Sequence, residues 1–83
     1  MRASFGWQLR AARVALGMTI DEVAAEAGLN RNSVFRAEKA PPRRMGVFAA
    51  ERISKALESR GICFSEFDGR AAVSLPNHRL TAA

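Results

Sequence analysis

The chain has too little of several residue types to belong to whole classes of protein. It contains one cysteine (Cys63), one histidine (His78) and no tyrosine among 83 residues. A single cysteine cannot form an internal disulfide, and one cysteine with one histidine are too few soft ligands for a zinc site. The sequence offers no Ser/His/Asp or Cys/His catalytic set that the one histidine could complete, and it contains no phosphate-binding glycine loop. We therefore expect no metal, no cofactor and no enzymatic activity.

Long apolar runs are absent too. No stretch approaches the roughly 18 apolar residues that a membrane span needs. The first residues, MRASFGWQ, lack the apolar core of a secretion signal. These features predict a cytoplasmic protein without membrane contact. With 48% hydrophobic and 25% charged residues, the composition is that of a globular domain. A chain of this length forms one small domain with a thin core.

The charge is unbalanced in the direction that favours nucleic acid. Thirteen Lys and Arg residues oppose eight Asp and Glu residues, for a net charge of +5. Most of the basic residues are Arg, whose planar guanidinium suits phosphates and guanine edges. The stretch from Arg31 to Arg44 holds five basic residues and one acid, Glu38. A small basic domain of this kind is typical of a nucleic-acid-binding protein.

Helical periodicity dominates the first sixty residues. The spacing predicts helices over 5–16, 20–27, 31–39 and about 45–59. Ser4 is the expected N-cap of the first helix, and Thr19 with Glu22 fits a capping box at the second. Gly28 ends the second helix, and Asn30 is the expected N-cap of the third.

The remaining pattern has the period of strands. Residues 62–67 and 70–75 flank Asp68-Gly69, the favoured dipeptide of a type I′ hairpin turn. A two-residue turn places Phe64 opposite Val73 and Ile62 opposite Leu75, all on one face. That face must pack on the fourth helix of its own chain or on a second copy, because an isolated hairpin is marginal in water. We therefore predict a helical bundle over 1–60, a hairpin over 61–75 and a frayed tail over 76–83.

Two short helices joined by a glycine-containing turn at 19–39 are a helix-turn-helix candidate. The matching segments are QLRAAR at 8–13, LGMT at 16–19, EVA at 22–24, AGLNR at 27–31, Val34, Glu38, RI at 52–53 and AL at 56–57. On these residues the chain resembles the lambda-repressor/Cro-like (XRE) family of DNA-binding domains. The resemblance implies a mainly α, compact bundle of four or five helices, with the third helix in the DNA major groove.

The resemblance also implies roles for individual residues. The base-reading candidates lie at the start of the third helix and one turn further on, and they are Asn30, Arg31, Asn32, Phe35 and Arg36. The phosphate-binding candidates are Arg10, Thr19, Ser33, Lys39, Arg43 and Arg44. Arg13 and Glu38 occupy the positions of a structural ion pair in the family, since a carboxylate on this helix would repel phosphate. Alternatively, Phe35 packs on the fourth helix. The arginines could likewise belong to an ordinary solvated surface without contacting DNA.

These features predict a sequence-specific transcriptional regulator. XRE domains generally bind inverted repeats as symmetric dimers, so a homodimer is expected, with Ile62, Phe64, Val73 and Leu75 as its contact residues. The simplest action is repression; activation from a second site through RNA polymerase is compatible with the same domain, and small members often serve phages or other mobile elements. The alternative is a protein-binding module, either an antitoxin or an adaptor, built on the same bundle.

Overall fold

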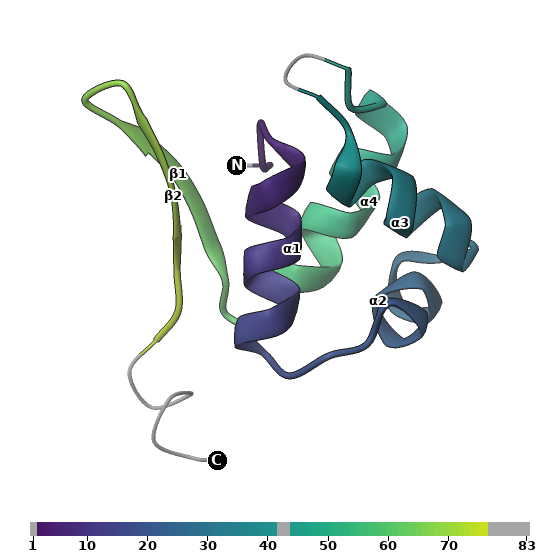
Figure 1. The fold of residues 1–83 in the computed structure, drawn as a ribbon. Coiled ribbons are helices and arrows are strands. Elements are labelled where there is room, and N and C mark those ends of the chain that lie inside the picture. Colours follow the sequence, from purple (N-terminus) through teal and green to yellow (C-terminus); the bar gives the residue numbers. More distant parts are fainter. Residues whose placement is uncertain (1, 42–43, 77–83) are drawn as a thin grey trace.

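The computed structural model describes residues 2–41 and 44–76, so most of the 76–83 tail lies outside the described residues. Four helices, α1 (Gly6–Ala15), α2 (Ile20–Ala27), α3 (Arg31–Lys39) and α4 (Val47–Glu58), precede two strands, β1 (Cys63–Phe67) and β2 (Arg70–Ser74). Figure 1 shows α1 in the middle, with the other helices on one side of it and the hairpin on the other. The predicted mainly helical bundle with a C-terminal hairpin is confirmed.

Local capping chemistry sets the helix ends. The second and third helices have the predicted bounds, with Thr19 and Asn30 as N-caps. The prediction of Ser4 as the first N-cap is wrong, because the N-cap is Phe5. The side chain of Gln8 supplies the missing acceptor: its Oε1 accepts hydrogen bonds from the backbone N–H groups of Ser4 and Phe5, at 2.9 and 3.0 Å. Two backbone donors just before α1 are therefore satisfied by a side chain of the helix itself.

The bundle core is made by one apolar stripe from each helix. Its largest fully buried side chains include Leu9, Val23, Val34, Ile53 and Leu57. The first helix approaches the end of α3 closely at Gly6, where an added Cβ would lie 2.4 Å from the carbonyl oxygen of Ala37. A residue without a side chain is therefore required at this contact.

The hairpin has the predicted register and turn. Phe64 pairs with Val73, and the ladder ends at Cys63–Ser74, one pair short of the predicted Ile62–Leu75 pair. Asp68 and Gly69 have φ values of 53° and 71°, as a type I′ turn requires. The strands extend beside α1, with a smaller contact to α4 (Figure 1).

The apolar face of the hairpin packs on its own protomer. Ile62 and Phe64 are 3% and 1% exposed, and Val73 and Leu75 pack against the same core. The Gln8 side chain also donates from Nε2 to the carbonyl oxygen of Ala72 at 3.0 Å, which ties β2 to α1. The structure thus shows the intrachain alternative for this face, with α1 as a larger support than the predicted α4.

Among residues 2–41 and 44–76, no helix has the length and hydropathy of a membrane span. The same residues contain no group of three or more His, Cys, Asp or Glu side chains placed to hold a metal ion.

Candidate nucleic-acid interface

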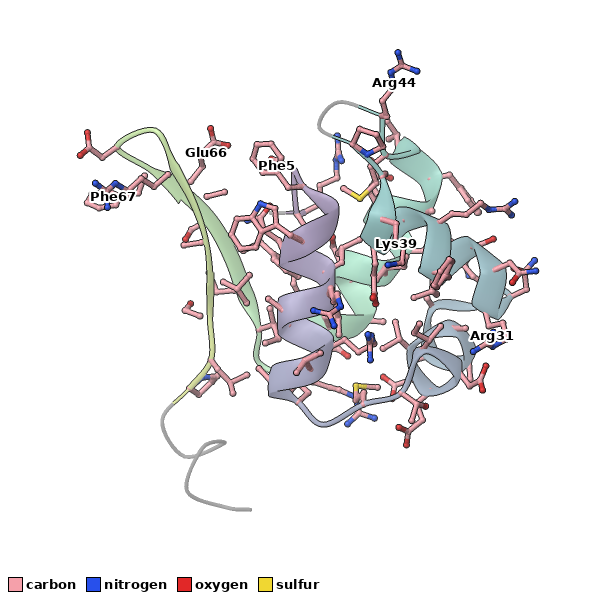
Figure 2. All side chains as sticks on the ribbon, viewed as in Figure 1. Phe5, Arg31, Lys39, Arg44, Glu66 and Phe67 are labelled. Carbon is pink, nitrogen blue, oxygen red and sulfur yellow. The ribbon has the colours of Figure 1, made fainter. Side chains whose placement is uncertain are left out.

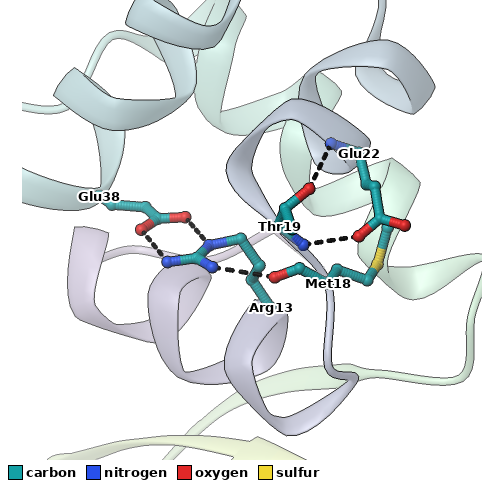
Figure 3. Close-up of polar contacts among 5 residues, drawn as sticks. All are labelled: Arg13, Met18, Thr19, Glu22 and Glu38. Carbon is teal, nitrogen blue, oxygen red and sulfur yellow. Dashed lines mark hydrogen bonds and ion pairs between the residues drawn. The ribbon is translucent and has the colours of Figure 1, made fainter.

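The two helices of the motif are held by caps at both sides of a tight turn. At the start of α2, the Thr19 hydroxyl accepts from the Glu22 N–H at 3.1 Å, and the Glu22 carboxylate accepts from the Thr19 N–H at 2.8 Å (Figure 3). Gly28 ends this helix with φ of 70°, a conformation that glycine adopts without a steric cost. The Asn30 side chain then accepts from the Ser33 N–H at 2.8 Å, and α3 begins. The start of α3 is therefore fixed relative to α2.

An ion pair fixes the other end of α3. The Arg13 guanidinium donates to both carboxylate oxygens of Glu38, at 2.6 and 3.0 Å, and to the carbonyl oxygen of Met18 at 2.9 Å (Figure 3). The two side chains are only 14% and 4% exposed. The hydrogen bonds with Glu38 raise the pKa of Arg13 above its ordinary value, although burial acts in the opposite direction. Glu38 therefore faces α1 rather than solvent, which explains an acid on a basic helix.

The outer face of α3 carries the base-reading candidates. Asn30, Arg31, Asn32, Phe35 and Arg36 are all exposed, whereas Val34, Ala37 and Glu38 are buried on the opposite face. Figure 2 shows Arg31 near the start of the helix and Lys39 near its end. The structure therefore brings these five side chains together on one surface.

Arg31 has a partner within the protein. Its Nε donates to Asp21 Oδ1 at 2.9 Å, and the two side chains are 61% and 72% exposed. An exposed pair of this kind contributes only about 0–1 kcal/mol, because water competes for both groups. A phosphate or a guanine edge could therefore replace Asp21 at little cost.

The Phe35 ring is exposed at the centre of this surface. It is 44% exposed, and the Lys39 ammonium lies 5.2 Å from the ring centroid. The ring is thus outward-facing, in contrast to the alternative of burial against α4. The Lys39 ammonium lies over one face of the ring, and the rest of its exposed surface could contact a thymine methyl group.

The phosphate-binding candidates lie on several elements. Lys39 and Arg44 are exposed after the base-reading surface, and Thr19 is exposed at the start of α2. Ser33, Arg36, Arg44 and the start of α4 line a hollow of about 200 Å³. Arg10 is exposed on α1, apart from the motif. Arg43 lies outside the described residues.

Two residues that support this surface were not assigned from the sequence. The Arg52 guanidinium on α4 donates from Nε to the carbonyl oxygen of Ala27 at 2.7 Å and so caps the end of α2. Asp21, in the first turn of α2, accepts the hydrogen bond from Arg31. The end of α2 lacks a basic residue of its own, which is the one sequence signal for a donor from elsewhere.

The family model described as helix-turn-helix matches residues 9–60, which is more than half of the chain. The chain belongs to the XRE-type helix-turn-helix family. Membership identifies it as a DNA-binding transcription regulator of the XRE type, in a family that is generally non-enzymatic. No curated protein matches the chain in sequence. The matched XRE-type region includes α2, the turn and α3, and it ends before the hairpin.

Proposed function

We propose that the protein is a sequence-specific regulator that places the outer face of α3 in the major groove and binds an inverted repeat as a symmetric dimer. The observation that carries this proposal is the exposed surface of Asn30, Arg31, Asn32, Phe35 and Arg36 on a helix held from behind by the Arg13–Glu38 pair. The helix is held at its two ends by the Asn30 cap and the Arg13–Glu38 pair, as precise placement of base-reading side chains requires.

The side chains on this face match the chemistry of base edges. Arg31 and Arg36 can each donate two hydrogen bonds to guanine O6 and N7, and Asn32 can pair with adenine N6 and N7. Each bidentate contact contributes about 1–3 kcal/mol of discrimination against the wrong base. Phe35 would contact a thymine methyl group. The side-chain oxygen of Asn30 accepts one hydrogen bond at the helix cap, and its NH₂ group can donate to DNA.

Phosphate contacts would supply position and affinity. Lys39, Arg43 and Arg44 follow the reading surface, and Arg10, Thr19 and Ser33 are the candidates elsewhere. The Thr19 hydroxyl accepts from Glu22 and retains its hydrogen to donate to a phosphate oxygen. Each contact by a Lys or Arg side chain should add about 0.9 to the negative slope of log affinity against log salt.

The regulatory outcome proposed is repression in the cytoplasm, at the nucleoid, by occupying a site that overlaps a promoter. A dimer with recognition helices about 34 Å apart would match one turn of DNA. Activation through RNA polymerase from a second site is compatible with the same binding mode, as is a role in a mobile element.

A selection from genomic fragments at about 150 mM salt tests the proposal. The native protein should enrich a few inverted-repeat sites, and Arg31→Ala/Arg36→Ala should not. The matched control is Arg2→Ala/Arg70→Ala, which removes the same charge from exposed residues outside α3. Failure of the native protein to enrich any site would contradict sequence-specific binding and direct the search to a protein partner, as for an antitoxin or adaptor. Equal loss in both double variants would show binding by net charge alone.

A further inference from the structure

The outer face of α4 is exposed, apolar at one end and outside the DNA surface. Val47 and Phe48 are 57% and 66% exposed, the latter beside a groove of about 540 Å³ between α2 and α4. The other end of the groove is lined by Ala56 and Ser59. Residues 48, 51, 52, 55 and 59 recur at intervals of three and four, so they form one stripe along the helix. This stripe includes no residue that we assign to DNA.

Two of the four charged residues that line this groove already have partners within the protein. The Glu26 carboxylate accepts hydrogen bonds from Arg60, and this contact lowers the pKa of Glu26. The Arg52 guanidinium is bound to the carbonyl oxygen of Ala27 and lies 5.3 Å from the centroid of the Phe48 ring. Glu51 and Lys55 remain, and neither has an ion-pair partner among residues 2–41 and 44–76. The stripe therefore presents one free charge of each sign, one helical turn apart.

We propose that this stripe binds the same stripe of a second copy, with the two α4 helices antiparallel across a two-fold axis near position 53. Positions 51 and 55 are equally far from that axis, so Glu51 of each protomer would face Lys55 of the other. Phe48 lies five positions before the axis, and the position five after it is Glu58, next to Ser59 at the far end of the groove. Each Phe48 would therefore enter the far end of the other protomer's groove. A surface that complements itself in this way is what a two-fold contact requires.

This inference deepens the proposed function, because it supplies the symmetric dimer with a contact surface. The hairpin face first expected to form that contact is buried against its own protomer, with Phe64 only 1% exposed. Contact through the α4 stripe leaves Arg31, Asn32 and Arg36 uncovered, so DNA and a second copy can be bound together. Since α4 spans only about 18 Å at 1.5 Å per residue, the contact is small and the dimer should be weak.

Charge exchange between the two positions gives a direct test. Sedimentation equilibrium of the full chain without DNA, over rising protein concentration, should show a monomer–dimer equilibrium. Glu51→Lys and Lys55→Glu should each weaken dimerisation by about tenfold, since each places like charges across the axis. An equal mixture of the two variants should regain the native affinity, because both pairs become complementary in the heterodimer. The double variant Glu51→Lys/Lys55→Glu should regain it alone, and Phe48→Ala should lose it.

Circular dichroism of each variant shows whether it remains folded, and recovery on mixing can occur only between folded chains. A native protein that stays monomeric at every concentration would overturn the proposal. A dimer that neither charge reversal weakens would also overturn it and indicate another surface, such as the strand edges of the hairpin. Because the measurement contains no DNA, its failure would leave the proposed DNA binding untouched.

Discussion

Two arginine–carboxylate pairs hold opposite ends of α3, and they differ chiefly in their exposure to water. Arg13 and Glu38, at the C-terminal end, are 14% and 4% exposed. Arg31 and Asp21, at the N-terminal end, are 61% and 72% exposed. The first pair joins α1 to α3, whereas the second joins the surfaces of α2 and α3. The same chemistry therefore serves two purposes along one helix.

The difference in exposure determines what each pair can do. Removing one partner of a buried pair leaves an uncompensated charge in a poorly solvated site, which costs several kcal/mol. Removing one partner of an exposed pair costs little, because water solvates the charge that remains. The buried pair therefore fixes the orientation of α3, and the exposed pair can be exchanged for a contact with DNA.

Neutralising Glu38 should have the largest effect on stability. We expect Glu38→Gln to lower the free energy of unfolding by about 3 kcal/mol, because Arg13 stays charged without its carboxylate partner. Urea denaturation measures the change. Asp21→Asn is the matched control and should change the same quantity by less than about 1 kcal/mol. Equal losses in the two variants would show that burial does not distinguish the pairs.

A substitution at Gly6 tests whether the close approach of α1 to α3 contributes to stability beside the Arg13–Glu38 pair. Gly6→Ala should lower the free energy of unfolding by about 1–3 kcal/mol, because its Cβ would lie 2.4 Å from the Ala37 oxygen and 2.7 Å from the Glu38 oxygen. The control is Gly46→Ala, where no atom lies within 4 Å of the added Cβ and φ is −62°. Thermal unfolding compares the two. An unchanged midpoint for Gly6→Ala would mean that the helices separate without cost.

Neutralising Asp21 should act on DNA binding rather than on stability. Asp21→Asn frees Arg31 and removes a negative charge beside the DNA, so affinity for a selected site should rise by up to about fivefold, equivalent to about 1 kcal/mol. Fluorescence anisotropy with a labelled duplex measures it. Glu66→Gln, in the hairpin, is the control for lost charge. Weaker binding by Asp21→Asn would show that the carboxylate orients Arg31 for reading instead of competing with DNA.

A third pair, Glu26–Arg60, lies between these two in exposure, and its contribution should depend on pH. Its side chains are 33% and 41% exposed, and the hydrogen bonds with Arg60 lower the pKa of Glu26. A carboxylate with a lowered pKa stabilises the folded state above its unfolded pKa and loses this contribution as pH falls through the folded value. The difference in unfolding free energy between the native protein and Glu26→Gln should therefore shrink on acidification. Urea titrations at several pH values test this, and a difference independent of pH would contradict it.

Local patterns predicted the elements that depend on neighbours in sequence. The starts of α2 and α3 follow from N-cap side chains that accept from an N–H group three residues further on. The hairpin register follows from the Asp68-Gly69 turn and from the alternation of apolar and polar residues. Contacts across the chain were not predictable in the same way. Gln8 joins α1 to Ala72, 64 positions away, and no local pattern marks it as a clamp. The same holds for Arg52 on Ala27, because a long basic side chain looks the same in sequence whether it is solvated or caps a helix.

In the candidate site too, the sequence predicted some features, whereas others depend on contacts made only in the folded chain. The periodicity of α3 and the resemblance to XRE domains were enough to select its outward residues, all of which the structure places on one exposed face. The engagement of Arg31 with Asp21 and of Asn30 with Ser33 depends on the turn geometry. The burial of the hairpin's apolar face depends on how the strands meet α1. The sequence alone did not decide between packing on the same chain and packing on a second copy.

NMR chemical-shift mapping with a duplex from the genomic selection tests the central claim most directly. Backbone amides of residues 30–36 and of the start of α2 should shift on binding, while those of β1 and β2 stay near their free positions. The guanidinium Nε–H signal of Arg13 should also persist, because its bond with Glu38 is kept. Shifts centred on the hairpin, with α3 unchanged, would contradict the assignment of α3 as the DNA-reading surface.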